Sequence, residues 1–149
     1  MKYYKGKYKL KNPTKYIGDP KNVVYRSHWE KMVFKWCESN SEVVRWGSEV
    51  LVVPYICATD RRSHRYFVDL HIEFKSGKTV CVEIKPKKQT IQPKSKRGKP
   101  KANYLKECMT YAKNQSKWEA ATKYCNKRGW SFQVWHEETL KSLGIKLLT

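Results

Sequence analysis

The chain has 149 residues, which suffice for one hydrophobic core but not for two well-sized ones, so a single domain over residues 1–149 is expected. With 32 Lys and Arg against 13 Asp and Glu, the formal net charge is +19, which disfavours basic partners and favours a polyanion, nucleic acid foremost. Five dispersed cysteines without a C-x-x-C pair indicate neither a disulfide framework nor a structural zinc site, and the lack of a signal segment or a long apolar stretch predicts a soluble, non-exported protein without a membrane partner.

The N-terminal part is predicted to be an extended arm followed by a helix. Residues 1–22 carry seven lysines and four tyrosines but no regular apolar period, which indicates a basic arm that could become ordered only on a partner. We predict a helix from Ser27, a typical N-cap, to about Glu38, because apolar residues recur there at helical spacing: Trp29, Val33 and Trp36.

Three strands are predicted next. The segment from Glu49 to Ile56 is rich in valine, and Pro54 within it indicates an edge strand or a bulge. The segments from Tyr66 to Phe74 and from Val80 to Lys85 alternate apolar and polar residues, and Ser76-Gly77 supplies a turn between them. These two segments therefore predict a hairpin.

The alternation also predicts the register of this hairpin. A slip of one residue would place apolar side chains opposite charged ones. A three-residue loop from Lys75 to Gly77, with Gly77 in the left-handed conformation, avoids that conflict. The resulting pairs are Leu70 with Val82, Ile72 with Val80, Val68 with Ile84, and Asp69 with Glu83.

A basic loop follows the hairpin directly. Residues 86–101 hold three prolines and no acid, a composition typical of a mobile loop, and its cations are candidates for contact with the DNA backbone: Lys87, Lys88, Lys94, Lys96 and Arg97. An ordinary solvated linker is the alternative. Two helices are then predicted, from about Lys101 to Lys113 and from Lys117 to Arg128, the second opened by a capping box of Ser116 and Glu119 and closed at Gly129. A strand from Trp130 to Trp135 and a short helix from Glu137 to Leu143 complete the chain.

The paired acids Asp69 and Glu83 predict a metal site. Carboxylates opposite each other on an antiparallel pair have Cβ atoms about 4.5 to 5.5 Å apart, a spacing that favours a shared divalent cation. Mg²⁺, or Mn²⁺ in its place, would need only these two side chains, a backbone carbonyl near Ile84 and a scissile phosphate. Lys85, two residues beyond Glu83 on the same face, could orient water and stabilise a charged transition state.

Asp69, a short hairpin and Glu83-Ile84-Lys85 resemble the D-(x)n-E-x-K signature of the PD-(D/E)XK nuclease superfamily, although Val68 stands where the superfamily has proline. The resemblance implies an α/β fold with a mixed sheet, a restriction-endonuclease-like core in which a helix, three antiparallel strands, a helix and a further strand follow in order. It also implies a catalytic acid from the first helix, for which Glu30 stands at the matching place. Ser27-x-x-Glu30 is equally a capping box, and Glu49 is the reserve candidate.

Four segments of the layout resemble the head-completion nucleases of tailed myoviruses and, more distantly, the TnsA-type endonuclease subunits of transposases: Tyr25-Arg26-Ser27-x-x-Glu30, Trp46-Gly47-Ser48-Glu49, Glu83-Ile84-Lys85-Pro86-Lys87 and Lys117-Trp118-x-Ala120-Ala121. The resemblance implies a metal-dependent endonuclease that processes packaged DNA at the portal vertex before tail joining, in the host cytoplasm during assembly or in the virion, with portal or neck proteins as partners.

Other functions fit the same residues. The chain could be a structural DNA-binding component of the virion neck whose catalysis is dispensable, or a junction-resolving nuclease with the same site. The charge alone would also suit a DNA-binding module without catalysis. His71 shares the predicted face of Asp69, where it could act as a general base or be a polar surface residue.

Overall fold

The computed structural model describes residues 3–147 and is built around a mixed four-stranded sheet. Its strand order is β3 (Val43–Ser48), β6 (Leu70–Phe74), β7 (Thr79–Ile84) and β8 (Ser131–Trp135). The β3–β6 and β6–β7 pairs are antiparallel, whereas β8 runs parallel to β7. The expected α/β class with a mixed sheet is confirmed.

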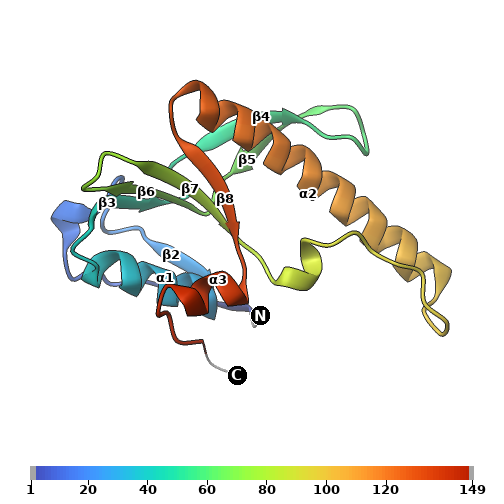
Figure 1. Cartoon of the computed structure of the whole chain (residues 1–149), viewed down its shortest axis with the longest axis horizontal. Coiled ribbons are helices and arrows are strands. Elements are labelled where there is room, and N and C mark those ends of the chain that lie inside the picture. The colour runs from blue at the N-terminus through green and yellow to red at the C-terminus, as the bar shows by residue number, and fades with distance from the viewer. Residues whose placement is uncertain (1–2, 148–149) are drawn as a thin grey trace.

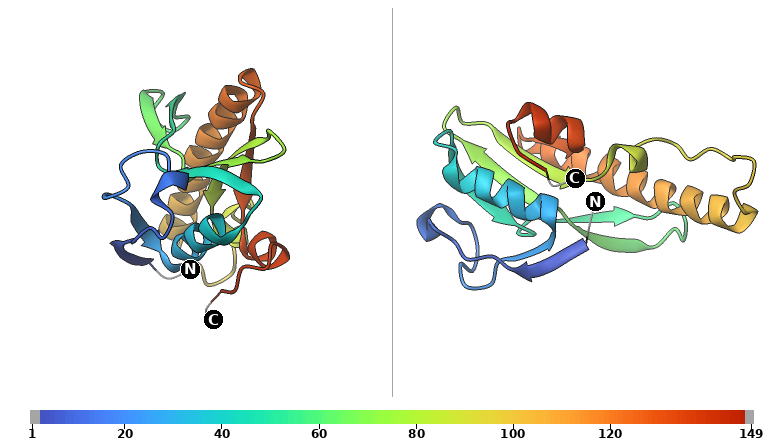
Figure 2. Two further views of the ribbon diagram at one scale, coloured as in Figure 1. Left: turned by 90° about the vertical axis from the view of Figure 1, so that its left-hand side faces the viewer. Right: turned by 90° about the horizontal axis from the view of Figure 1, so that it is seen from below.

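Helices cover both faces of this sheet (Figure 1). Helices α1 (His28–Ser39) and α3 (Glu137–Ser142) lie on one face, and α2 (Lys101–Lys127) lies on the other, as the views of Figure 2 also show. Two clusters of buried apolar residues correspond to these layers. Along β7, Val80, Val82 and Ile84 belong to the α1 cluster, while Cys81 belongs to the α2 cluster with Trp118, Ala121 and Cys125. The alternating side chains of β7 thus contribute to both buried clusters, one on each face of the sheet.

The β6–β7 hairpin has the predicted register over its paired length. Leu70 lies opposite Val82 and Ile72 opposite Val80. Gly77 has φ 88°, and its amide donates to the carbonyl of Phe74 at 3.0 Å, so the loop is the predicted three-residue loop with a left-handed glycine. The pairing ends at Leu70 and Val82, so the further pairs predicted for Val68 and for Asp69 do not form.

The predicted strand from Tyr66 to Phe74 is in fact two strands. The chain bends at Val68 and Asp69, which separate β5 (Ser63–Phe67) from β6. Val68 packs in the α2 cluster with Tyr66, not with Leu70 in the α1 cluster. The amide of Val68 donates to Leu51 at 3.0 Å and the carbonyl of Asp69 accepts from Glu49 at 3.2 Å, so pairing with a different segment replaces the pairing with β7.

The predicted strand from Glu49 to Ile56 is also wrong in its bounds. The first strand of the four-stranded sheet is β3, which was not predicted from the sequence. Strand β4 (Val52–Ile56) pairs with β5 in a separate two-stranded ribbon. Glu49 lies in the break between them with φ 54°, a conformation that ends a strand. The expected order of helix, three antiparallel strands, helix and strand therefore corresponds to α1, then β3, β6 and β7, then α2 and β8. The β4–β5 ribbon is inserted between β3 and β6.

Helix α1 has the predicted start and its predicted capping box. Helix α2 corrects the prediction of two helices, because its 27 residues are continuous. Residues 101–128 contain neither glycine nor proline, and Ser116, predicted as a cap, lies inside the helix. Its hydroxyl donates to the carbonyl of Ala112 at 3.0 Å and accepts the amide of Ala58 at 3.1 Å. A potential capping side chain does not end a helix when its hydroxyl forms other hydrogen bonds.

The N-terminal arm, expected to order only on a partner, is folded onto the domain from residue 3 onward, and Met1 and Lys2 lie outside the described residues. It forms β1 (Tyr3–Lys7) and the 3-10 helix η1 (Pro13–Lys15), and β1 pairs with β2 (Val24–Ser27). Buried Glu38 anchors the arm, because its carboxylate accepts the Tyr8 hydroxyl at 2.6 Å and the amides of Lys11 and Asn12 at 2.7 Å. The lack of apolar periodicity concealed these polar anchors.

The basic loop of residues 86–101 contains a short 3-10 helix, η2 (Lys87–Gln89), and leads to the free end of α2. The buried residues of α2 are Asn114, Trp118, Ala121 and Cys125, all in its second half. The first half of α2 and the loop therefore project from the body, at the right of Figure 1. Within residues 3–147, no helix combines the length and apolar character needed to cross a bilayer.

Candidate active site

The bend between β5 and β6 places Asp69 beside the end of β7. The Oδ2 atom of Asp69 accepts the backbone N–H of Ile84 at 2.8 Å. Glu83 precedes Ile84 on β7 and is only 6% exposed. Burial is the larger cause of the raised pKa of Asp69, and the two carboxyl groups are close enough that the negative charge of Glu83 raises it further. The structure therefore brings together the two acids predicted to converge, by a bend and a side-chain hydrogen bond in place of strand pairing.

Glu83 is held by one hydroxyl and one amine. Its Oε2 atom accepts the Tyr66 hydroxyl at 2.8 Å, and its Oε1 atom lies 3.6 Å from Nζ of Lys85. Burial raises the pKa of Tyr66 far above its usual range, and the nearby negative charges of Glu83 and Asp69 raise it further. Tyr66 consequently remains a hydrogen-bond donor at any physiological pH. The three predicted residues Asp69, Glu83 and Lys85 thus form one cluster.

Burial raises the pKa of Asp69 well above its ordinary value of 3.8, and the charges of Glu83 and Glu30 raise it further. The hydrogen bond from Ile84 opposes the shift but does not reverse it. A partly buried acid and a buried one this close repel each other when both are ionised, and either a proton or a cation relieves the repulsion. A divalent cation between them would let both carboxyls ionise.

Glu30 forms the predicted capping box and also lies near the acid pair. Its Oε2 atom accepts the amides of Arg26 at 2.6 Å and Ser27 at 3.1 Å, which completes the capping box of α1. Its charge also raises the pKa of Asp69, so it lies near the acid pair. Burial raises the pKa of Glu30 itself, and the charge of Glu49 adds to the effect. The capping box engages Oε2 only.

A pocket of about 490 Å³ opens beside the acids and is lined by residues from five segments: Arg26, Glu49, Arg65, Tyr66, Phe67, Asp69, Glu83 and Lys117. Glu49, the reserve candidate, forms an ion pair with Arg26 across this pocket. It lies just after β3, not at the start of a strand as predicted. The left-handed backbone at Glu49 turns the chain so that Glu49 lines the pocket together with Asp69.

Lys117 is a pocket residue that the sequence did not identify. Its Nζ atom lies 5.5 Å above the ring of Tyr66, on the side of the pocket formed by α2. Burial lowers the pKa of Lys117, and the neighbouring cations Lys113 and Lys85 lower it further, while the acids oppose them. The only sequence signal was the Lys117-Trp118 pair: Trp118 faces the core at 8% exposure, so its neighbour had to lie at the core margin.

The other sequence candidates lie outside the pocket. Among the loop cations, Lys87 is bound to α3, since its amide donates to Glu137 at 2.6 Å and its amine to Glu138 at 3.1 Å. Lys88, Lys94, Lys96 and Arg97 are spread along the projecting loop. His71 is buried at 8% exposure, with Glu73 at 3.2 Å and the ring of Trp130 at 5.0 Å. His71 is therefore neither a pocket residue nor a surface residue.

Comparison with known proteins agrees with this geometry. The profile of the TnsA-like endonuclease N-terminal family matches residues 40–137, a range that runs from just before β3 to the first residue of α3 and includes Asp69, Glu83 and Lys85. The chain belongs to this family, and its core is restriction-endonuclease-like. Over 146 residues it is also 41% identical to the head completion nuclease of Enterobacteria phage T4, covering 96% of this chain and 97% of that protein.

Proposed function

We propose that this protein is a Mg²⁺-dependent endodeoxyribonuclease that processes packaged double-stranded DNA at the portal vertex of a phage head before the tail joins. The observation that carries the proposal is the cluster of Asp69 and Glu83, which line the pocket, with Lys85 beside Glu83. Family membership and the close relative, named a head completion nuclease, support the reaction class and the setting. Under this proposal, the protein acts in the host cytoplasm during assembly or in the virion, in contact with portal or neck proteins.

The acid pair fits a hard divalent cation. Both carboxyls present oxygen atoms, the ligands that Mg²⁺ and Mn²⁺ prefer, and the raised pKa of Asp69 indicates a site that favours an added positive charge. Asp69 and Glu83 would hold the ion, with the carbonyl of a residue near Ile84 as a further ligand. Once bound, such an ion neutralises charge on the phosphate and lowers the pKa of the attacking water.

The chain's own residues supply the remaining steps. Lys85 lies 3.6 Å from Glu83 and can orient the attacking water and stabilise the negative charge that develops on the phosphate. Lys117 faces the same pocket from α2 and can bind a non-bridging phosphate oxygen. Tyr66 fixes the rotamer of Glu83 through its hydroxyl. Glu30 completes the site as a second acid near Asp69 while it caps α1.

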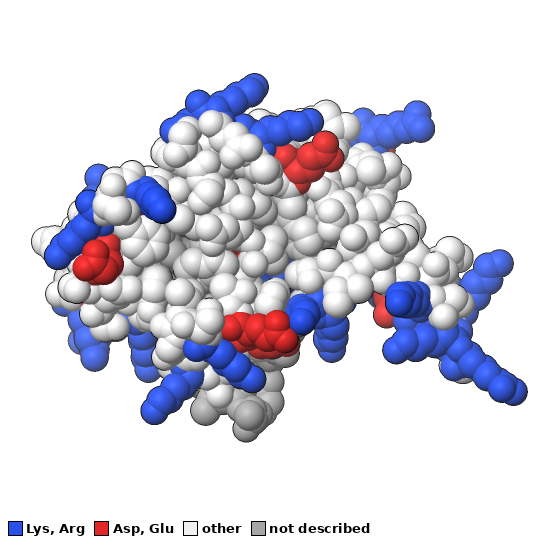
Figure 3. Space-filling view, in the orientation of Figure 1, with Lys and Arg blue, Asp and Glu red and all other residues white. Residues whose placement is uncertain are grey.

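The charged surface suits a duplex. Lys and Arg side chains gather at the projecting end formed by the basic loop and the start of α2, at the right of Figure 3. Exposed cations neutralise phosphates without reading bases, which fits an enzyme with little sequence preference. The proposed DNA-binding residues are those of the loop: Lys87, Lys88, Lys94, Lys96 and Arg97. Residues 1–149 are proposed to act as a single domain in this task.

Plasmid nicking tests the proposal. The full chain should convert supercoiled plasmid to nicked and linear forms with Mg²⁺, and neither Asp69→Asn nor wild type in EDTA should do so. Complementation of a phage that lacks the protein then separates catalysis from a structural role. Rescue of infectivity by Asp69→Asn to the wild-type level would overturn the enzymatic function, because a structural neck component needs no cleavage.

A further inference from the structure

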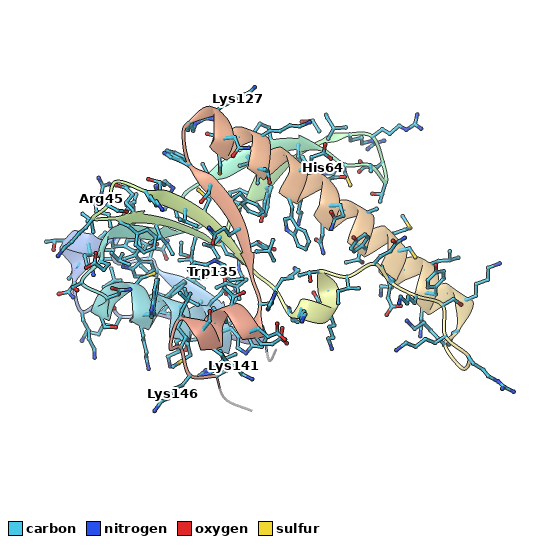
Figure 4. All side chains as sticks on the ribbon, viewed as in Figure 1. Arg45, His64, Lys127, Trp135, Lys141 and Lys146 are labelled. Atoms are coloured by element: carbon cyan, nitrogen blue, oxygen red, sulfur yellow. The ribbon has the colours of Figure 1, made fainter. Side chains whose placement is uncertain are left out.

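The β4–β5 ribbon carries a second group of metal-ligating side chains away from the acid pair. Cys57 follows β4, Asp60 lies in the turn, and His64 is the second residue of β5. Their ligand atoms all lie within 4.8 Å of one another, and within residues 3–147 no other group of three or more His, Cys, Asp and Glu side chains meets that condition. Figure 4 labels His64 on this ribbon, which packs against α2.

The three side chains are already oriented toward one another. Nε2 of His64 lies 2.7 Å from Oδ2 of Asp60, which fixes the imidazole, and the ring stacks on Tyr55 with centroids 5.6 Å apart. Sγ of Cys57 lies 3.0 Å from Oγ1 of Thr59. Tetrahedral zinc bonds of about 2.0 to 2.3 Å place ligand atoms about 3.3 to 3.8 Å apart. The three ligand atoms, which lie within 4.8 Å of one another, would therefore need to shift by about 1 Å at most to bind the ion.

Both oxygens of Asp60 are held in place. The backbone N–H of Arg62 donates to Oδ1 of Asp60 at 2.9 Å, while Oδ2 lies beside His64. The carboxylate therefore has a fixed orientation toward the imidazole.

The turn that holds the group is tightly defined. The amide of Cys57 donates to the carbonyl of Arg62 at 3.0 Å, and the amide of Arg61 donates to the carbonyl of Cys57 at 2.7 Å. Arg61 has φ 58°, the left-handed conformation that costs a non-glycine residue free energy. Strain of this kind persists where surrounding contacts compensate for it, and it concentrates at ligand sites.

We propose that Cys57, Asp60 and His64 form a second metal site for a borderline-soft divalent transition metal, zinc foremost, with the fourth position open to water. Sulfur, nitrogen and carboxylate oxygen together suit tetrahedral Zn²⁺, whereas a thiolate disfavours Mg²⁺. The sequence concealed the site because its spacing, Cys-x2-Asp-x3-His, contains a single cysteine and lacks the C-x-x-C pair.

Such a site would stabilise the wall of the catalytic pocket. A two-stranded ribbon is marginally stable by itself in water, so a cross-link between its ends would hold β5 in place. Strand β5 carries Arg65, Tyr66 and Phe67, which all line the pocket, and Tyr66 hydrogen-bonds to Glu83. The role proposed here is therefore structural and separate from the acid pair.

Cobalt substitution tests this site in the full-length protein. Co²⁺ added to the metal-free chain should produce the near-ultraviolet sulfur-to-cobalt charge-transfer band and the intense visible bands of a tetrahedral site, and Zn²⁺ should displace both. The charge-transfer band should be lost in Cys57→Ser and kept in Cys108→Ser, a matched cysteine on α2 outside the group. Asp69→Asn should also keep both bands, which separates this site from the catalytic one.

Because Cys57 is buried, His64→Gln supplies a second variant at a partly exposed position. It should lose the intense tetrahedral bands while circular dichroism shows an unchanged fold. Absence of a charge-transfer band in the wild-type protein, or its persistence in Cys57→Ser, would overturn the site. Neither result would affect plasmid cleavage by the acid pair as a test of the proposed function.

Discussion

Asp69 accepts the backbone N–H of Ile84 at 2.8 Å although Asp69 itself belongs to no strand. Had β6 continued through Asp69, backbone pairing would have occupied that amide. The bend instead frees the Ile84 amide for the carboxylate and directs Asp69 toward Glu83. A side-chain hydrogen bond thus takes the place of a backbone pair between the two strands, and the geometry of the acid pair depends on this bond.

Glu83→Gln and Lys85→Met should separate cleavage from binding. Each variant keeps the size of the side chain but removes the charge that acts on the phosphate, so nicking should fall by about 100-fold or more. DNA affinity in a gel-shift assay should stay within about threefold of wild type, because the projecting cations supply most of it. Glu119→Gln, a matched exposed acid on α2, should cleave normally. Equal loss of binding and cleavage in Glu83→Gln would contradict the assignment.

Asp69→Asn should stabilise the protein in EDTA at neutral pH. The folded-state pKa of Asp69 is raised above its unfolded value of 3.8, so its contribution to stability is fully present below pH 3.8 and is lost as the pH rises through the folded pKa. Asparagine removes the partly buried charge and can still accept the Ile84 amide. Thermal unfolding should show a higher Tm, by about 2 to 4 °C for each kcal/mol of repulsion relieved.

Added metal should reverse the order of stability of the two proteins. Mg²⁺ or Mn²⁺ should raise the Tm of the wild-type protein and leave Asp69→Asn nearly unchanged, because the substituted pair binds the ion weakly. An Asn variant that is less stable than wild type in EDTA at neutral pH would show that Asp69 is ionised without strain, contrary to the raised pKa.

Lys117→Met should reduce cleavage by about 10- to 100-fold, because an amine in the pocket is replaced by an apolar chain of similar length. Its stacking against Tyr66 is largely conserved by methionine, so the fold should not change. The matched control is Lys123→Met, which alters an exposed lysine of α2 paired with Glu119. Equal activity of the two variants in plasmid nicking would remove Lys117 from the site.

Replacement of Lys94, Lys96 and Arg97 by alanine should weaken DNA binding without preventing cleavage at saturating protein. Each lost phosphate contact should lower the slope of log affinity against log salt by about 0.9. A control triple variant at Lys141, Lys146 and Lys35, on the α1 and α3 side, should keep the wild-type slope. An unchanged slope in the loop variant would identify the loop as an ordinary linker.

The sequence predicted those elements whose local pattern and tertiary environment agree. Periodicity located α1 and β7, and Gly77 and Gly129 marked turns that adopt positive φ. The acid pair was predicted from alternation alone. Asp69 and Glu83 do lie together, but not through the predicted strand pairing, because that pairing stops one residue short of Asp69.

Other features depended on contacts between distant segments, which periodicity does not record. Strand β3 reads as a mixed segment because only Val43, Trp46 and Gly47 are buried in it. Val68 alternates with Leu70 in sequence but lies in the other core, because the chain leaves one sheet for another between them. Lys117 and Tyr66 come together only in the folded chain, where α2 lies beside β5. No local sequence pattern predicts that contact.

Helix α2 also determines how this protein would meet a duplex. At about 1.5 Å per residue, its 27 residues span about 40 Å, and roughly half of that length has no buried residue. A rod of about 20 Å beyond the catalytic pocket matches about six base pairs of duplex at 3.4 Å each. Protection from hydroxyl radicals should therefore be lopsided, extending several nucleotides farther on one flank of the cut than on the other.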